Sequence, residues 1–473
     1  MGFLTRLMEP RQQLAEERKT FTDAMLKAMI IPLVIEQLLQ MIVGLADNMM
    51  VSHAGETVEA CTAVVAGVGL DTMIYTIFIY LFTALAAGGA VVVAQYIGSR
   101  DREHSSIAAS QIFFLSGVLS LVCMVLMLLF GKGLLHLMYP DVDSMTMEAC
   151  ETYLWIVALS FPANAIYNAG AAIYRTMGKT AVTMKVSLAV NIINVIGNAI
   201  GVFVLKAGAA GVAWPTTISW YVGAVVMTWL CMRPKEKAGD DKTVRVQARH
   251  MLTLDAAMSK RILSVAIPNS VENTLFQAAK VVLGMLVATF GASQIAANTT
   301  GQTFWSLAAC MGTSMGTVFI TVIGQLTGAG DAEAAEWYMR RLLRLSVLLA
   351  LVWNAAVMVL TPLLLPLYDL TDETKRLILI IVAIHNAFSA TVQPFSGPLS
   401  SGLRAAGDVK FTMWASIFAT VVCRTLLSYL LCLWLFHWGV IGITVAMVLD
   451  WCIKAALDIW RFRSGKWKNK RVI

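Results

Sequence analysis

Residues 28–51 read AMIIPLVIEQLLQMIVGLADNMMV, an apolar run that is interrupted by Pro32, Glu36 and Asp47. A helix of this length crosses the roughly 30 Å hydrocarbon core of a bilayer. Similar runs recur along the 473-residue chain, in which 58% of residues are hydrophobic and 14% are charged. Soluble domains carry about 25% charged residues. A soluble core could not bury so much apolar surface, which argues against a cytosolic enzyme, a nucleic-acid-binding protein and a disordered chain.

Twelve apolar runs are long enough to span a membrane. Only helices or closed barrels satisfy their backbone groups inside a bilayer. The sequence therefore predicts an all-α integral membrane protein with twelve transmembrane helices. The predicted spans are 28–51, 66–94, 107–130, 150–173, 186–205, 209–232, 263–290, 300–326, 343–367, 378–402, 411–436 and 439–460.

The basic residues gather on one side of this predicted topology. Of the 36 Lys and Arg, 29 lie in the N-terminal segment 1–27, in alternate connectors and in the tail 461–473. Cytoplasmic loops are enriched in Lys and Arg, so both termini and the 233–262 loop are predicted to be cytoplasmic. The net charge of +7 is then a product of topology, and no nucleic-acid partner is expected. The basic tail is expected to contact anionic lipid head groups, and segment 1–27 lacks the pattern of a signal peptide.

The two halves of the chain resemble each other at offsets of 229 to 236 residues. Because six spans separate the copies, the repeat is parallel, related by a pseudo-two-fold axis along the membrane normal. It predicts two six-helix lobes, 28–232 and 263–460, joined by the linker 233–262. The four matches are Ile31–Leu39 with Ile267–Leu275, Gln95–Asp101 with Gln325–Asp331, Arg175–Gly178 with Arg404–Gly407, and Gly208–Gly211 with Gly439–Gly442.

Polar residues inside apolar spans are costly, so they are the candidate functional residues. In the first span, Glu36, Gln40 and Asp47 share one helix face. In the fifth span, Asn194 and Asn198 are one turn apart, and Asn191 is close by. Amide and carboxylate oxygens together suit a hard cation. Hydrogen bonding between helices is the alternative interpretation. The sequence favours the functional one at Asp47 and leaves both open for the other residues.

The second lobe contributes Glu272, Lys280 and Arg424 as candidate cavity or gating residues, with Arg424 as a possible partner of Glu272 or Glu36. Asp71 and Asp450 are expected to be solvated or to cap helices near span ends. Prolines in or near the spans are expected to kink helices; Pro32 and Pro268 are the candidate hinges.

No Walker loop, HExxH or GxSxG motif is present, and the six His are dispersed. The sequence therefore predicts no enzyme, no catalytic residue and no cofactor. The parallel repeat is typical of transporters. Without a phosphate-binding loop, transport by such a protein would have to be driven by an ion gradient.

From about residue 25 to 467 the chain resembles the multidrug and toxic compound extrusion (MATE) family, most closely its prokaryotic DinF-like branch. The resemblance rests on an ordered set of short motifs rather than on any one of them. They are Asp47 with Ala66–Gly69, Gln95–Gly98, Arg175–Lys179, Gly208–Ala213, Gly291 to Asn298, Gly324–Gly328, and Asp450-Trp451 with Arg461–Trp467.

The resemblance implies a transporter of the prokaryotic inner membrane that exports small organic, often cationic, compounds in exchange for H⁺ or Na⁺. A monomer is the simplest expectation for its oligomeric state. It implies an ion site formed by a first-span Asp, an Asn and an Asp in the fifth span, and a sixth-span Thr. Asp47, Asn194 and Thr216 match this set, whereas Asn198 stands in place of the second Asp. No other metal site is implied. Another branch uses a seventh-span Glu two turns after the proline, and here Glu272 follows Pro268 by one turn.

Three alternatives remain open at this stage. A lipid-linked oligosaccharide flippase would need basic residues in its cavity, because its cargo is anionic. A membrane-embedded lipid-modifying enzyme would need a His, Asp or metal cluster at one interface. A channel would conduct without a counter-gradient, and the two-lobe repeat fits it less well.

Overall fold

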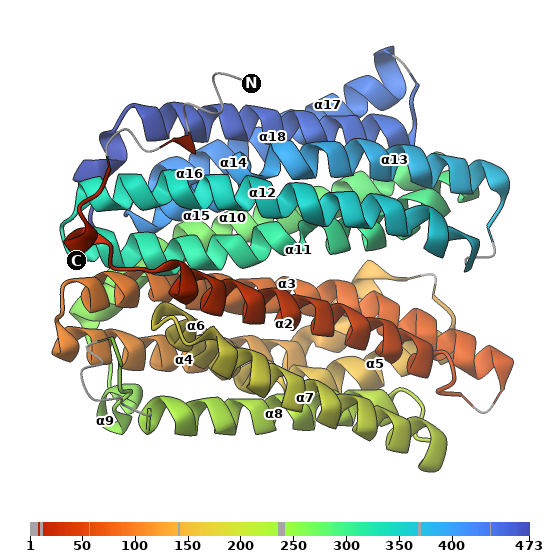
Figure 1. Ribbon diagram of the computed structural model, residues 1–473. Helices are drawn as coiled ribbons and strands as arrows, with labels where there is room; N and C mark the ends of the chain where they lie inside the picture. Colours follow the sequence, from red (N-terminus) through yellow and green to blue (C-terminus); the bar gives the residue numbers. More distant parts are fainter. Residues whose placement is uncertain are drawn as a thin grey trace. The chain divides into compact units, whose positions relative to one another are not determined.

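A computed structural model gives the structure of the protein and describes residues 8–9, 13–55, 57–140, 142–234, 242–367, 370–435 and 437–473. Within these ranges the chain is helical and forms no strand (Figure 1). The helices of the first half are α2 (Asp23–Val51), α3 (Val58–Gly98), α4 (Arg102–Met138), α5 (Ser144–Ala158), α6 (Phe161–Thr176), α7 (Thr180–Ala199), α8 (Ala210–Met232) and α9 (Ala248–Leu252). Those of the second half are α10 (Ala256–Ala288), α11 (Ala292–Gly328), α12 (Ala332–Leu364), α13 (Asp372–Thr391), α14 (Gln393–Ser396), α15 (Pro398–Ala405), α16 (Val409–Ser416), α17 (Thr425–Tyr429) and α18 (Val440–Arg463).

The apolar helices account for all twelve predicted spans. In the described part of the chain, nine helices are long and apolar enough to cross a membrane. Two more spans are bent pairs, α5 with α6 at 47° and α13 with α14–α15 at 60°. The remaining predicted span, 209–232, corresponds to α8, a helix of 23 residues that contains Pro215. The predicted all-α membrane fold is confirmed, although several helices run beyond their predicted spans; α3, for example, covers 58–98 rather than 66–94.

Prolines lie at both of the bends. Pro162 is in the first turn of α6, and Pro394 and Pro398 are in the first turns of α14 and α15. Proline fits the first turn of a helix because that turn's N–H has no partner there. Pro32 and Pro268 instead lie inside the continuous helices α2 and α10, where each removes one backbone hydrogen bond. Their role as hinges stays a prediction.

The chain divides into two compact units. The N-unit contains residues 31–93 and 100–270, and the C-unit contains 1–30, 94–99 and 271–473. The predicted domain boundaries stay predictions. Parts of the N-terminal segment (1–7 and 10–12) and of the linker (235–241) lie outside the described residues.

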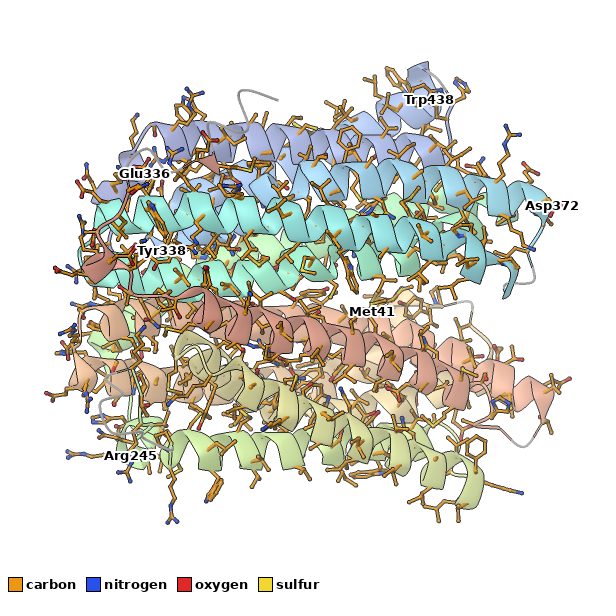
Figure 2. The ribbon with its side chains drawn as sticks, viewed as in Figure 1. Met41, Arg245, Glu336, Tyr338, Asp372 and Trp438 are labelled. Atoms are coloured by element: carbon orange, nitrogen blue, oxygen red, sulfur yellow. The ribbon has the colours of Figure 1, made fainter. Side chains whose placement is uncertain are left out.

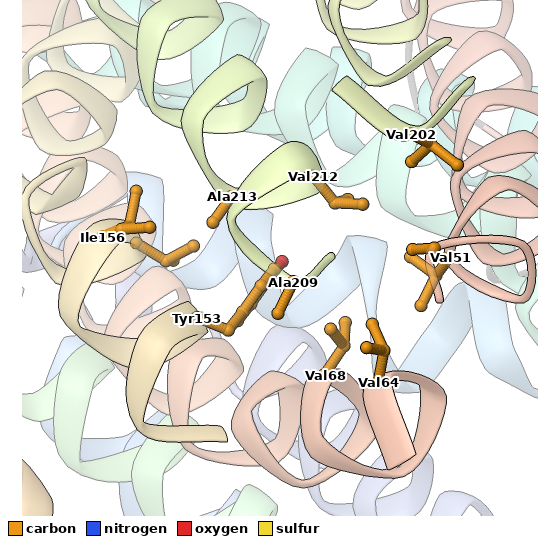
Figure 3. Close-up of a cluster of buried hydrophobic side chains, with 11 residues drawn as sticks. Val51, Val64, Val68, Tyr153, Ile156, Val202, Ala209, Val212 and Ala213 are labelled. Carbon is orange, nitrogen blue, oxygen red and sulfur yellow. The ribbon is translucent and has the colours of Figure 1, made fainter. Parts of the chain in front are cut away.

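An apolar cluster in the N-unit joins four helices and the turn after α7 (Figure 3). It contains Val51 of α2, Val202 after α7 and Val212 of α8, packed with Tyr153 and Val68. The three valines lie four residues, one helical turn, from Asp47, Asn198 and Thr216 respectively. Close packing resists movement of its members, so the cluster fixes the ends of the helices that carry these three polar residues.

The helix ends of the C-unit alternate along the chain, as spans that cross a membrane require. Glu336 and Tyr338 lie at one end of the unit, and Asp372 and Trp438 lie at the other (Figure 2). The segment before α2 is held at the first end, where the Tyr338 hydroxyl donates to the carbonyl of Phe21 at 2.8 Å. Partial burial favours the neutral form of Asp331, but hydrogen bonds from Arg18 outweigh it and hold the pKa of that carboxyl below its usual value.

Two equivalent glycines of the repeat make reciprocal contacts inside the C-unit. A Cβ added to Gly98 would lie 1.8 Å from the carbonyl oxygen of Gln325. One added to Gly328 would lie 1.9 Å from the carbonyl oxygen of Gln95. Each copy of the Gln-x-x-Gly motif therefore contacts the other in the same way.

The Gln95 side chain also fixes the end of the chain. Its Nε2 donates to the carbonyl of Ala405 at 2.8 Å, and its Oε1 accepts from the backbone N–H of Val472 at 3.0 Å. Residues 94–99 are thus tied to two distant segments of the C-unit.

We expect Gly328→Val to reduce sharply the yield of folded protein, because the added side chain would overlap a backbone carbonyl. Overpacking costs typically 1–3 kcal/mol and more where the backbone must move. The measurement is the yield of monodisperse protein after extraction in detergent. Gly133→Ala is the matched control, since no atom lies within 4 Å of its Cβ position; an equal loss in both variants would contradict the close contact.

Candidate functional site

The four residues predicted to hold a coupling ion lie together in the N-unit. Asp47 is on the last turns of α2, Asn194 and Asn198 are on α7, and Thr216 is on α8. Asn198 Nδ2 donates to Asp47 Oδ1 at 2.8 Å, and Asn194 is 3.0 Å from the Thr216 hydroxyl. With the Asn194 amide turned over, its nitrogen donates to both Asp47 oxygens at 3.0 and 3.2 Å and its oxygen accepts from Thr216. This orientation satisfies both atoms of the Asn194 amide, and we adopt it.

The α7 and α8 backbones approach closely beside this site. A Cβ on Gly197 would lie 2.6 Å from the Cβ of Pro215. Glycine at this position therefore allows α7 to pack directly against the proline turn that precedes Thr216. The same approach brings Asn194 and Asn198 within reach of α8.

The site has more oxygen atoms than donors to satisfy them. Asn198 is fully buried, and its Oδ1 has no hydrogen-bond partner among the described residues. Asp47 is half-buried and is the only carboxylate of the four residues. Buried polar atoms are rarely left unpaired, so a proton or a hard cation would complete the set. Across the described chain, no group of three or more His, Cys, Asp or Glu is arranged to hold a metal ion.

The other polar residues of the first and fifth spans do not join this site. Glu36 is fully buried and accepts hydrogen bonds from Arg175 Nη2 at 2.8 Å and the Thr183 hydroxyl at 3.2 Å. Gln40 is exposed. Asn191 is half-buried, and its Nδ2 has no partner in the part of the chain that the structure describes. The polar face of α2 thus divides into an ion pair at Glu36 and the Asp47 site.

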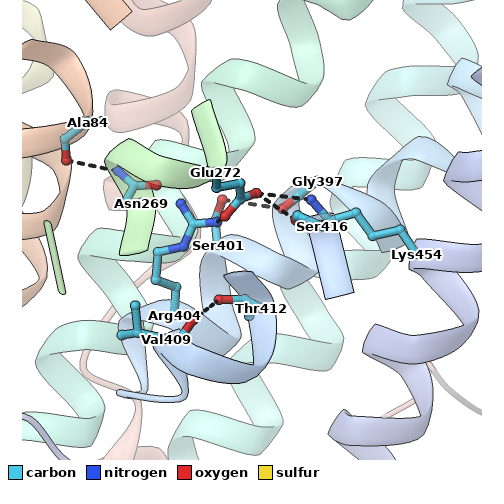
Figure 4. Close-up of polar contacts among 10 residues, drawn as sticks. All are labelled: Ala84, Asn269, Glu272, Gly397, Ser401, Arg404, Val409, Thr412, Ser416 and Lys454. Atoms are coloured by element: carbon cyan, nitrogen blue, oxygen red, sulfur yellow. Dashed lines mark hydrogen bonds and ion pairs between the residues drawn. The ribbon is translucent and has the colours of Figure 1, made fainter. Parts of the chain in front are cut away.

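Glu272 forms the corresponding ion pair in the C-unit (Figure 4). Arg404 Nη2 donates to its Oε2 at 2.8 Å, Ser416 Oγ to its Oε1 at 2.6 Å, and Lys454 Nζ lies 3.3 Å from Oε1. Glu272 and Arg404 are the repeat equivalents of Glu36 and Arg175. Both copies therefore build the same Glu–Arg pair, with the same 2.8 Å separation.

The predicted partner of Arg424 was wrong. Its guanidinium pairs with Asp450, not with Glu272 or Glu36. Both acids already have an arginine from their own copy of the repeat, which leaves Arg424 for the nearest remaining carboxylate.

Asp71 and Asp450 were also wrongly expected to be solvated or capping. Their exposed fractions are 0% and 1%. Asp71 lies deep inside α3, which begins at Val58, and accepts from the Cys150 thiol at 3.4 Å. Asp458, which the sequence did not single out, is fully buried, and neither of its carboxylate oxygens has a partner among the described residues.

A pocket in the C-unit brings two of the predicted cavity residues together. Lys280 and Arg424 line it with Trp305, His385 and Gln302. A second pocket shares Trp305 and Arg424 with the first and reaches the Glu272 ion pair. Trp305 and His385 were missed because a single Trp or His in an apolar span carries no sequence signal that separates it from an ordinary core residue.

Comparisons with known proteins agree with this architecture. An uncharacterized transporter, YisQ, of Bacillus subtilis (strain 168) is 25% identical over 93% of this chain and 94% of its own length. A probable multidrug resistance protein, NorM, of Thermotoga maritima is 22% identical over 98% of this chain and 96% of its own. The solved structure of a multidrug resistance MATE family transporter of the MOP superfamily, in an outward-facing conformation, has a TM-score of 0.84 at 20% identity, covering 96% of this chain and 98% of that one.

The family comparison is decisive. The MatE family model matches residues 32–200 and again 268–430, more than half of the chain. The two matched segments coincide with the two copies of the internal repeat. The chain therefore belongs to the MATE family of multidrug and toxic compound extrusion transporters.

Proposed function

We propose that this membrane transporter is an antiporter that exports organic compounds in exchange for H⁺ or Na⁺, with the coupling ion bound at Asp47. The observation that carries the proposal is the N-unit site, in which one carboxylate is surrounded by amide and hydroxyl oxygens. The similarity to a probable multidrug resistance protein supports the efflux direction.

Asp47 is the group that changes charge in this mechanism. While it is ionised, it accepts hydrogen bonds from Asn198 and Asn194 and attracts a cationic compound. Binding of H⁺ or Na⁺ neutralises it, which weakens that attraction and releases the compound. Pro32 lies in the same helix and lowers the cost of bending α2 between the two states.

The proposal is tested by efflux from proteoliposomes. Ethidium is loaded, and a Na⁺ gradient and a pH gradient are imposed separately. Efflux that depends on one gradient supports the antiporter and identifies its ion. No gradient-dependent efflux of ethidium or of an anionic dye would overturn the proposal and favour the lipid-linked oligosaccharide flippase.

We expect Asn198→Asp to increase the affinity of the site for Na⁺ by about 10- to 100-fold. The substitution adds a second carboxylate, and an interaction with a charged group contributes about 1.5–3 kcal/mol. The measurement is Na⁺-dependent thermal stabilisation of the purified protein. Asn191→Asp is the control, because it makes the same substitution on the same helix at a residue outside the hydrogen-bonded set. Equal stabilisation of both variants by Na⁺ would place the ion elsewhere.

A further inference from the structure

We infer that the C-unit pocket binds compounds that carry an anionic group beside an aromatic ring, such as an aryl carboxylate or sulfonate. The inference rests on the proposed transport function and names a substrate class for it. It is carried by the charge, the unpaired donors and the aromatic walls of the pocket.

The pocket has an excess positive charge. Among the described residues, Lys280 and Arg424 are the charged side chains that line it, and no acid of that set does. Arg424 is paired with Asp450. In the described part of the chain, no carboxylate lies within 4 Å of the Lys280 ammonium. Glu272, the acid of the adjoining pocket, is already held between Arg404 and Lys454.

The buried polar atoms of the pocket include hydrogen-bond donors that have no acceptor among the described residues. Trp305 Nε1 is buried without a hydrogen-bond partner among the described residues, and an indole N–H can only donate. His385 is 2% exposed, and both of its ring nitrogens are unpartnered in the same described set. Lys280 adds up to three more donors. A compound with several acceptor oxygens would satisfy the Trp305 N–H, one imidazole N–H of His385 and the Lys280 ammonium.

Aromatic rings surround the Lys280 ammonium. Its Nζ lies 4.9 Å from the ring centroid of Trp305 and 5.4 Å from that of Phe276. Contact with ring faces stabilises an ammonium group without a carboxylate. Trp305 also lines the pocket, and its ring provides a flat apolar surface on which an aryl group of the compound can stack.

The internal repeat shows that this polarity is opposite to that of the N-unit site. At the offset of 236 that relates Pro32 to Pro268, Leu283 takes the place of Asp47. The C-unit copy therefore has no carboxylate at this position. The C-unit pocket suits an anionic group, so compounds that carry such a group beside an aromatic ring, including zwitterions that also have a cationic centre, are expected to bind there.

The test is calorimetric binding to the purified full-length protein in detergent, without a gradient. The probes are 1-naphthylacetate and 1-naphthylmethylammonium, which share one ring and differ in charge. We expect the acetate to bind at least about tenfold more tightly, and Lys280→Gln to remove this preference. Lys280→Arg should keep it, and Lys410→Gln, at an exposed lysine of the same unit, should leave it unchanged.

Two results would overturn the inference: tighter binding of the ammonium compound by the wild-type protein, or an unchanged preference in Lys280→Gln that elutes as folded protein. If Lys280→Gln does not fold, loss of the preference in Lys280→Arg would overturn it as well. Binding without flux under either gradient would refute the antiporter but not the pocket. Gradient-driven flux of ethidium with no binding of the acetate would refute the pocket but not the antiporter.

Discussion

Asp47→Asn abolishes gradient-driven efflux in the mechanism proposed above. The amide cannot bind a proton and carries no charge to attract Na⁺, so the site no longer changes charge during the cycle. Its carbonyl oxygen can still accept the hydrogen bond that Asn198 Nδ2 donates at 2.8 Å. The protein should therefore fold normally, while flux in proteoliposomes falls to the level of protein-free vesicles.

Asp23→Asn is the matched control for this experiment. It makes the same chemical change on the same helix, at a side chain that is 70% exposed and paired with Arg341. Surface substitutions of this kind change stability by about 0.5 kcal/mol or less, and flux should stay within about twofold of wild type. Wild-type flux in Asp47→Asn, with the same dependence on the gradient, would show that coupling lies at another residue.

Glu272→Gln should cause the largest loss of stability. The Glu272 side chain is 14% exposed, and removing its charge takes away the carboxylate that Arg404 and Lys454 share in nearly buried positions. Breaking a buried ion pair by removing one partner costs about 3–5 kcal/mol. We expect a clear fall in the melting temperature of the detergent-solubilised protein, with gradient coupling retained by the molecules that remain folded.

A double-mutant cycle measures the interaction between Glu272 and Arg404 apart from the other contacts that each side chain makes. Adding Arg404→Met to Glu272→Gln should recover part of the lost stability, because the arginine that paired with this carboxylate is then replaced by an apolar side chain. Glu373→Gln, at an exposed position on the first turn of α13, should have little effect. An unchanged melting temperature in Glu272→Gln would mean that the ion pair is not structural and that Glu272 is available for ion coupling.

The fold could be predicted from sequence because hydropathy and charge act over whole helices. Twelve long apolar runs leave few ways to satisfy the backbone hydrogen-bonding groups in a bilayer. Errors of a few residues at the ends of the predicted spans did not change the predicted fold. The Asp47 set was identified through family resemblance, and the structure brings its four residues together.

The pairing of charges could not be predicted in the same way. The offsets of the repeat match Glu36 to Glu272 and Arg175 to Arg404, but they do not say that each glutamate contacts the arginine of its own copy. Arg424 was assigned to the wrong acids because distance along the chain says nothing about which helices are neighbours. Asp71 was expected near a span end, yet α3 begins eight residues earlier than predicted and places it in the interior.

The reciprocal contact of Gln95, Gly98, Gln325 and Gly328 limits how this transporter can be recombined with its relatives. Residues 94–99 come from the first half of the sequence but pack within the C-unit, where Gln95 binds Ala405 and Val472. A chimera joined at the 233–262 linker would therefore exchange more than one set of helices: it would import a foreign 94–99 segment into the retained C-unit. Functional hybrids should be those in which this segment and its partners come from the same parent.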